Sequence, residues 1–505
     1  MGGLQTTWGE TWGRGVSLKR VAGFSLNWVW VLMVFYSIVP YLSSSDVRGS
    51  LYINLFVSLC AMVVTMLFIA ILVPRDERVG SNRYVVVGAA LIMCAGSVLT
   101  MFSDLTTTTG MLMLGISSIM TGTSSAVLFL AWIEVFSGGG GRLALIEISC
   151  AMCAAFVIAF ALTIVPPLAA DVAIVLLPPA SALLLLRLKR NEHQAPSAPR
   201  GVISRQTIGL FVKALLGAAL FGAIEGFFDV LSGYQTYAVQ DIYGTYLFLA
   251  GFLAALATAL IAVFLFRDSV SYTYRLAMLL LCAGCLFTPF MGDNSTYSTA
   301  FIFGGYGCFT AALCVVCINV SRSFNVGPTR AIGLGFVALY GGEVLGALCA
   351  HTIEAVGVSE FNLAVLTVVA VLVLLVSHLF LFTEIDLIRV GIGELDAVVV
   401  ADGLERVSAT GEGAGEAEGG PDPIDPIDPG ALIAERYGLS PRETEVLQLL
   451  LQGRTISRIQ ESLFISAGTV STHIRHIYHK VGVENRQGLI DLVEELFDAP
   501  ERTRD

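Results

Sequence analysis

Apolar residues gather into long runs over most of the chain and into short spaced stripes near its end. Twelve runs, each near the roughly 20 residues that a helix needs to cross a bilayer, alternate with short polar connections. Pro178, Pro179 and Pro289 fall inside these runs, where we expect kinks rather than helix ends. We predict twelve membrane-spanning helices, at about 21–42, 51–73, 84–102, 110–136, 143–165, 168–188, 208–231, 243–266, 272–291, 298–320, 331–354 and 361–383.

The predicted helices form two sets of six, at about 21–188 and 208–383, within a membrane domain of residues 21–390. The stretch "KRNEHQAPSAPRGVISR" separates the two sets. An offset of 188 residues superimposes Arg142 on Arg330, each between the fourth and fifth helices of its half. The pattern therefore predicts a six-plus-six repeat.

The connection between the second and third helices, "RDERVGSNR", fits an acid-Arg-x-Gly-x-x-Arg signature. Together with twelve helices and a long central connection, it resembles the major facilitator superfamily, which implies that superfamily's all-α fold. Ser81 departs from the basic residue usual there. The matching residues are Glu77, Arg78, Gly80 and Arg83.

Composition agrees with a membrane protein, because 55% of the 505 residues are hydrophobic and only 14% are charged. Placing the N-terminus in the cytoplasm puts almost all loop Lys and Arg inside, and Arg48 alone outside. We therefore expect a multi-pass protein of a bacterial cytoplasmic membrane, with both termini cytoplasmic and residues 1–20 a retained lead. The ten cysteines lie in apolar segments, so we expect no disulfide framework, no metal site and no cofactor.

Ionisable residues inside the predicted spans are candidates for a ligand site, because burying them is costly. Glu225 and Asp229 lie four residues apart and share one helix face, and Glu343 is similarly deep in its span. For these three, a ligand cavity and helix–helix hydrogen bonding stay open as alternatives. Three other acids and a histidine are weaker candidates: Glu134, Glu147, Glu354 and His351. We expect Glu134 and Glu354 to be solvated, because they lie at the ends of their spans.

The last part of the chain changes character. Residues 391–430 are rich in Gly, Pro and acids, which predicts a disordered linker. In residues 431–500, Ser440 and Glu443 form a capping box around Pro441, and Gly482 ends a later helix. That later helix has Val470, Ile474, Ile477 and Val481 on one buried stripe and polar residues outward, and a fourth helix starts at Asn485. Two short helices joined by a tight turn predict a helix-turn-helix.

From Leu439 to Val493 the sequence resembles the LuxR-type DNA-binding domain, a small four-helix helix-turn-helix domain. The resemblance rests on "LSPRETEVL", Gly453, Ile459 and "ISAGTVSTH". Ser471 departs from the family's usual lysine. The resemblance to the LuxR-type domain implies that the protein binds double-stranded DNA as a dimer at an inverted repeat. Leu489, Ile490 and Val493 are a candidate dimer face. The expected DNA-binding residues are Arg458, Thr469, Val470, Ser471, Thr472, Arg475, His476 and Lys480.

A membrane domain joined to such a domain looks like a one-component membrane sensor. We expect a small molecule to meet the membrane domain and change DNA binding, with the lipid membrane and RNA polymerase as further partners. Two alternatives stay open: a transporter that also signals occupancy, and a C-terminal module that serves protein interaction only. No motif in the sequence supports catalysis, so we do not expect an enzyme.

Overall fold

The computed structural model is all-helical and divides into two compact units, Met1–Ala397 and Val398–Asp505, called here the membrane unit and the C-terminal unit. It describes residues 16–74, 77–138, 141–189, 205–236, 243–264, 269–291, 296–324, 326–356, 360–380, 433–434, 436–451, 456–463, 467–483 and 489. Residues 1–15 of the predicted lead 1–20 and the predicted linker 391–430 lie outside this set, whereas residues 18–20 of that lead belong to the first helix.

The described part of the membrane unit has all twelve predicted long helices. They are α2 (Leu18–Phe35), α3 (Val47–Leu72), α4 (Arg83–Met101), α5 (Thr108–Phe136), α6 (Gly141–Ile164), α7 (Pro167–Lys189), α8 (Arg205–Thr236), α9 (Tyr243–Phe264), α10 (Ser269–Met291), α11 (Thr296–Phe324), α12 (Pro328–Val356) and α13 (Glu360–Phe380). Within the described residues, eleven are long and apolar enough to cross a membrane, and α13 has a shorter apolar stretch, Ala364–Ser377. Pro178, Pro179 and Pro289 lie inside helices, as predicted.

The first helix is shorter than the sequence predicts. We expected it to run to about residue 42, but α2 ends at Phe35 and a 3-10 turn, η1 (Val39–Tyr41), follows. Pro40 lies in the first turn of η1 and cannot supply the backbone N–H that a continuing helix needs. The Tyr41 hydroxyl then donates to the Val34 carbonyl (2.7 Å) and holds the turn against the end of α2.

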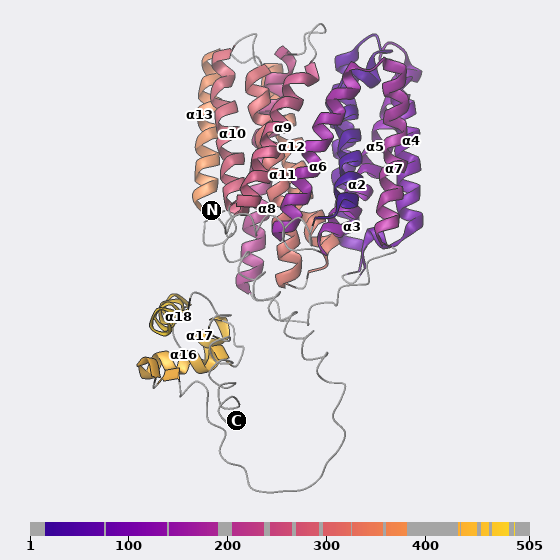
Figure 1. Cartoon of the computed structure of the whole chain (residues 1–505). Coiled ribbons are helices and arrows are strands. Elements are labelled where there is room, and N and C mark those ends of the chain that lie inside the picture. The colour runs from indigo at the N-terminus through magenta and orange to yellow at the C-terminus, as the bar shows by residue number, and fades with distance from the viewer. Residues whose placement is uncertain are drawn as a thin grey trace, which may run out of the picture. The chain divides into compact units, whose positions relative to one another are not determined.

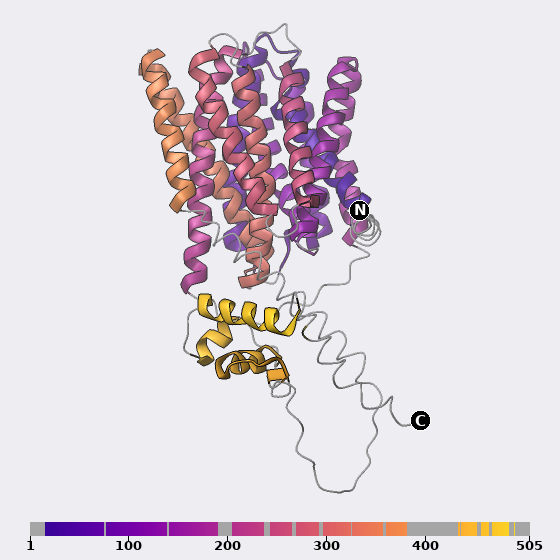
Figure 2. The same ribbon diagram turned by 60° about the vertical axis from the view of Figure 1, so that its left-hand side comes forward.

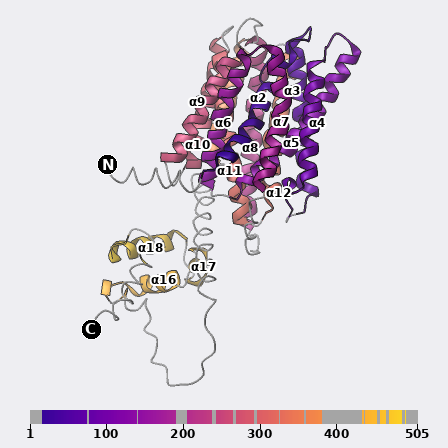
Figure 3. The same ribbon diagram turned by 45° about the vertical axis from the view of Figure 1, so that its right-hand side comes forward.

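The two sets of six helices lie side by side. Figure 1 shows α2–α7 towards the right and α8–α13 towards the left, and the turned view in Figure 3 shows α3 and α4 at one side and α9 and α10 at the other. The sets meet where α3 packs on α12 and α6 packs on α9. Large side chains such as Trp30, Trp132 and Phe336 fill the core, whereas many Leu, Val and Phe residues on outer faces are exposed, as a lipid-facing surface requires.

Small residues bring α8 and α12 into backbone contact. A Cβ at Gly226 would lie 2.3 Å from the Glu343 carbonyl oxygen, and one at Gly346 would lie 1.9 Å from the Ala223 carbonyl oxygen. Neither position therefore tolerates a larger side chain without moving the helices apart. Such close packing replaces the hydrophobic driving force that is missing between helices in lipid. It also brings the acidic residues of α8 and α12 together.

Two arginines at matching positions, called here the arginine caps, tie the halves to each other. Arg142, in α6, donates to two carbonyls at the end of α9 (2.8 and 2.9 Å). Arg330, in α12, donates to two carbonyls at the end of α3 (2.9 and 3.3 Å). The last carbonyls of a helix lack partners within the helix, and its dipole favours a cation there. The 188-residue offset in the sequence thus corresponds to reciprocal helix caps across the two halves.

The C-terminal unit contains α16 (Pro441–Leu451), α17 (Ile456–Leu463) and α18 (Ala467–Val481). Figure 2 shows these three short helices as one group. They share a core in which Leu447, Ile459 and Ile477 are fully buried. Gly482 has a positive φ of 78°, and its N–H donates to the Tyr478 carbonyl (2.9 Å), so it ends α18 as predicted. Of the predicted fourth helix, the structure describes only Leu489.

Candidate functional site

The outward face of α18 carries the polar residues expected to read DNA. Ser471 and Arg475 are both exposed and lie four residues apart, so they share one helix face. Thr469 and His476 are also exposed, and Thr472 is half-buried. The opposite side of α18 is anchored in the core through Ile477. A helix held this way presents hydrogen-bonding side chains at a fixed spacing, which is what base-edge contacts require.

Two of the expected DNA-binding residues do not fit this face. The Val470 side chain is 0% exposed and packs in the core, so the expectation that it contacts DNA is not supported by its position. The Lys480 ammonium lies 2.7 Å from Glu443 Oε2 and 3.2 Å from the Gly438 carbonyl oxygen. It therefore joins the end of α18 to the start of α16. The side chain of Arg458 lies outside the described residues.

Glu443 organises the start of α16. Its Oε2 accepts from the Ser440 N–H (2.7 Å), and its own N–H donates to Ser440 Oγ (3.4 Å), which confirms the predicted capping box. Lys480 and these hydrogen bonds lower the pKa of the Glu443 carboxyl to about 2. A second contact ties the helices together, because Arg442 Nη2 donates to the Leu463 carbonyl at the end of α17 (2.5 Å). Sequence reasoning found the capping box but missed both inter-helix roles.

The candidate dimer face is not free as expected. Leu489 is 0% exposed and belongs to the core of the C-terminal unit, so it stabilises the fold of one copy. Its burial therefore does not support the predicted role in pairing two copies, which stays a prediction. Ile490 and Val493 lie outside the described residues.

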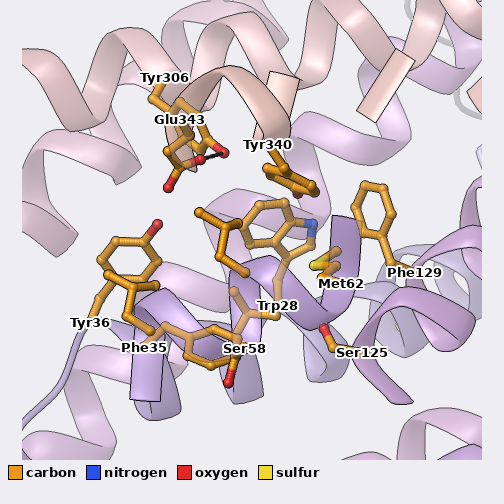
Figure 4. A pocket seen from close by; sticks show the side chains of 13 residues that line it. Trp28, Phe35, Tyr36, Ser58, Met62, Ser125, Phe129, Tyr306, Tyr340 and Glu343 are labelled. Atoms are coloured by element: carbon orange, nitrogen blue, oxygen red, sulfur yellow. Dashed lines mark hydrogen bonds between the residues drawn. The ribbon is translucent and has the colours of Figure 1, made fainter. Parts of the chain in front are cut away.

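The membrane unit contains a cavity between its two halves, of about 580 Å³ including space open to solvent. Helices α2, α3 and α5 of the first half line it together with α11 and α12 of the second. Figure 4 shows Trp28, Tyr36, Phe129 and Tyr340 around the cavity, with the Glu343 carboxylate facing the same space as the Tyr36 hydroxyl. A lining of aromatic and apolar side chains with a few polar groups is typical of small-molecule sites.

One of the three expected ligand-binding acids lines this cavity, and the other two lie close to that acid. Glu343 lines the cavity, and its Oε2 accepts from the Tyr306 hydroxyl (2.9 Å). Glu225 is 4% exposed, its Oε2 has no hydrogen-bond partner among the described residues, and it interacts electrostatically with Glu343 and with the half-buried Asp229. Glu225 and Glu343 are 118 residues apart in the sequence, and the structure brings them together with Asp229.

The weaker candidates have structural partners. We expected Glu134 to be solvated, but it is 1% exposed and accepts from the N–H groups of Val79 and Gly80 (both 2.9 Å) and from the Thr329 hydroxyl (2.6 Å). That expectation was wrong, because the acid-Arg-x-Gly connection folds back over the end of α5. Glu147, also 1% exposed, forms an ion pair with Arg20 (3.0 Å).

His351 contacts the Tyr52 hydroxyl, which gives this ring an aromatic partner in α3. The side chain of Glu354 lies outside the described residues. His351 is not among the residues that line the cavity described above.

These features define a helix-turn-helix domain on the same chain as a multi-pass membrane unit with a cavity between its two halves. The family described as "Bacterial regulatory proteins, luxR family" matches residues 438–493, so the C-terminal helix-turn-helix is a LuxR-family domain.

Relatives named HTH-type transcriptional regulators, from Mycobacterium bovis and Mycobacterium tuberculosis, are 40% identical over 53 residues. The match covers 10% of this chain, and the chain spans only 6% of the length of those relatives. The likeness is therefore confined to the C-terminal domain.

The membrane unit is similar to a bacterial homologue of the iron transporter ferroportin in an outward-facing state, with a TM-score of 0.50 and 12% identity over 74% of this chain and 97% of that one. The same homologue with soaked iron matches with a TM-score of 0.50 and 10% identity, over the same shares of the two chains. The human organic anion transporter MFSD10 matches with a TM-score of 0.46 and 14% identity, over 72% of this chain and 100% of that one. The likeness to the ferroportin homologue shows that the membrane unit has a major-facilitator-like fold.

Proposed function

We propose that the chain is a membrane-bound one-component transcriptional regulator, which binds a small molecule in the membrane unit and double-stranded DNA through α18. The observation that carries the DNA-binding half of the proposal is the exposed pair Ser471 and Arg475 on one face of a core-anchored helix. Thr469, Thr472 and His476 flank that pair, and Arg458 comes from α17. RNA polymerase is a further partner, because a bound regulator acts on transcription through it.

The membrane half of the proposal rests on the cavity. It is lined from both halves, so a ligand there would contact both sets of helices, and its affinity would depend on how the two sets are arranged. A ligand that prefers one arrangement shifts the population toward it, and the C-terminal domain would report that shift to DNA. The distribution of Lys and Arg supports placing that domain on the cytoplasmic side.

The test uses the full chain in lipid nanodiscs and DNA libraries selected for binding. We expect a preferred inverted-repeat sequence, bound by two copies, and a loss of sequence discrimination of about 1–3 kcal/mol in Arg475→Ala. Arg83→Ala serves as the control, because this exposed arginine belongs to the membrane unit and contacts Tyr84. Binding without any sequence preference would favour a C-terminal module that serves protein interaction only.

A second candidate function is transport coupled to signalling, which the cavity between the halves favours. Uptake into proteoliposomes separates the two candidates, because a receptor accumulates nothing whereas a transporter concentrates or equilibrates its ligand. Orientation has its own test. A tag at residue 505 that can be labelled only from outside the cell would contradict the regulator proposal.

A further inference from the structure

The chemistry of the cavity wall restricts the kind of ligand that fits. Six of the thirteen lining residues are aromatic, and none of the thirteen is basic: Trp28, Phe35, Tyr36, Phe129, Tyr306 and Tyr340 provide the rings. Glu343 is the one ionisable acid among the lining residues. Aromatic faces carry negative electrostatic potential, so rings and carboxylate together attract a positive charge.

Further acidic groups lie directly behind the wall, and they carry negative charge when they are ionised. Tyr36, which lines the cavity, interacts electrostatically with Glu343, Glu225 and Asp229. Among the described residues, the groups whose charge is recorded as acting on Glu225 are Glu343 and Asp229, and both are acids. Like charges in an apolar setting repel each other, and a bound cation relieves that repulsion.

The helix contacts fix this negative charge in place. Glu225 lies in α8 next to Gly226, and Glu343 lies in α12 next to Gly342, at the glycine contacts where the two backbones touch. Neither helix can move away without losing that packing. Glu225 Oε2, which is buried and has no hydrogen-bond partner among the described residues, is therefore an acceptor held ready for a donor that the described part of the protein does not supply.

We propose that the cavity binds an organic ammonium ion, with its positive charge between the Glu343 carboxylate and the tyrosine rings and its apolar part against Trp28 and Phe129. This inference rests on the proposed function and specifies its ligand class. A bare metal ion fits less well, because no group of three or more His, Cys, Asp or Glu side chains in the described residues could hold one. Aromatic rings, in contrast, are the surroundings that ammonium groups use.

Calorimetry on the full chain in nanodiscs tests the proposal with matched probes. Choline is compared with 3,3-dimethylbutan-1-ol, which replaces the charged nitrogen by carbon at nearly constant shape, and benzyltrimethylammonium serves as a larger cation. We expect at least one ammonium probe to bind about tenfold or more tightly than the neutral alcohol. Equal binding of the cations and the alcohol, or no binding of any cation, would overturn the proposal.

Variants locate the binding. Glu343→Gln should weaken ammonium binding by about tenfold or more, because the amide keeps the shape and removes the charge. Tyr340→Phe keeps the ring and should stay within about threefold, whereas Tyr340→Leu should lose about tenfold. Asp171→Asn is the control, since this half-buried acid of α7 does not line the cavity. Equal losses in Asp171→Asn and Glu343→Gln would contradict the assigned site.

The two proposals fail separately. If ammonium probes bind as expected but leave DNA binding by the full chain unchanged, the ligand class stands and the sensing role is wrong. If DNA binding is specific but no ammonium probe binds, the regulator remains and the ligand class is wrong. Melting temperatures of all variants, measured in the same nanodiscs, show whether a lost signal reflects lost folding.

Discussion

Lys480→Met separates a structural role for this lysine from a role in contacting DNA phosphate. The Lys480 ammonium lies 2.7 Å from Glu443 Oε2, and the two side chains are 39% and 6% exposed. Solvent-exposed ion pairs contribute about 0–1 kcal/mol, and removing one partner of a fully buried pair costs about 3–5 kcal/mol. A half-exposed lysine on a buried carboxylate lies between these cases. We expect Lys480→Met to lower the free energy of unfolding by about 1–2 kcal/mol.

The assay is urea unfolding of residues 431–505, combined with the salt dependence of DNA binding by the full chain. For a domain of this size, each kcal/mol corresponds to about 4–8 °C in melting temperature, which is easily measured. A purely structural lysine leaves the salt dependence unchanged, whereas loss of a phosphate contact lowers its slope by about one. Glu443→Ala should cost about 1 kcal/mol more than Lys480→Met, because it also removes the cap on Ser440.

Arg475→Met is the matched control, since it removes a cation from the same helix at an exposed position. We expect it to change stability by less than about 0.5 kcal/mol and to impair DNA binding instead. The reasoning is refuted if Lys480→Met leaves stability unchanged, or if it lowers the salt slope while the domain stays as stable as before.

Three further predictions follow from contacts in the two units. The folded-state pKa of Glu443 is about 2, below its ordinary value. The stability that Glu443 provides should therefore be complete above about pH 4.5 and decline toward pH 2. Circular dichroism should show this decline, and Glu443→Gln should abolish it. Gly342→Ala should destabilise the membrane unit by more than about 2 kcal/mol in thermal unfolding, because the added Cβ would lie 2.1 Å from a backbone oxygen of α8. Gly341→Ala is the control and should be neutral or stabilising, because a Cβ at Gly341 meets nothing within 4 Å. Arg330→Ala should lower the melting temperature of the membrane unit more than Arg83→Ala, since only Arg330 caps a helix of the other half; equal effects would contradict that role.

Helix-scale features were predictable because they depend on neighbours in sequence. The membrane helices follow from the length of the apolar runs, and the capping box at Ser440 follows from residue types three positions apart. The buried stripe of α18 follows from helical spacing, although Ile474 is only partly buried. The error at the end of α2 also has a local cause, because Pro40 was counted within the span rather than as its end.

Contacts between distant segments were not predictable in the same way. Glu134 looked like a solvated residue at a span end, and only the fold-back of the Val79–Gly80 turn shows that it is buried. Lys480 looked like a phosphate contact, and only the packing of α18 on α16 shows its ion pair. Each of these contacts joins residues at least 37 positions apart.

The sequence by itself determined the helices, their membrane-spanning length, the split into two halves and the helix-turn-helix at the end, because apolar periodicity and caps act over one or two turns of a helix. Only the tertiary structure decided that Glu225 and Asp229 approach Glu343, the acid that lines the aromatic cavity. Their meeting depends on the close approach of α8 and α12 at glycines, and the distance between two backbones is set by side chains on both helices at once. No single segment of the chain contains that information.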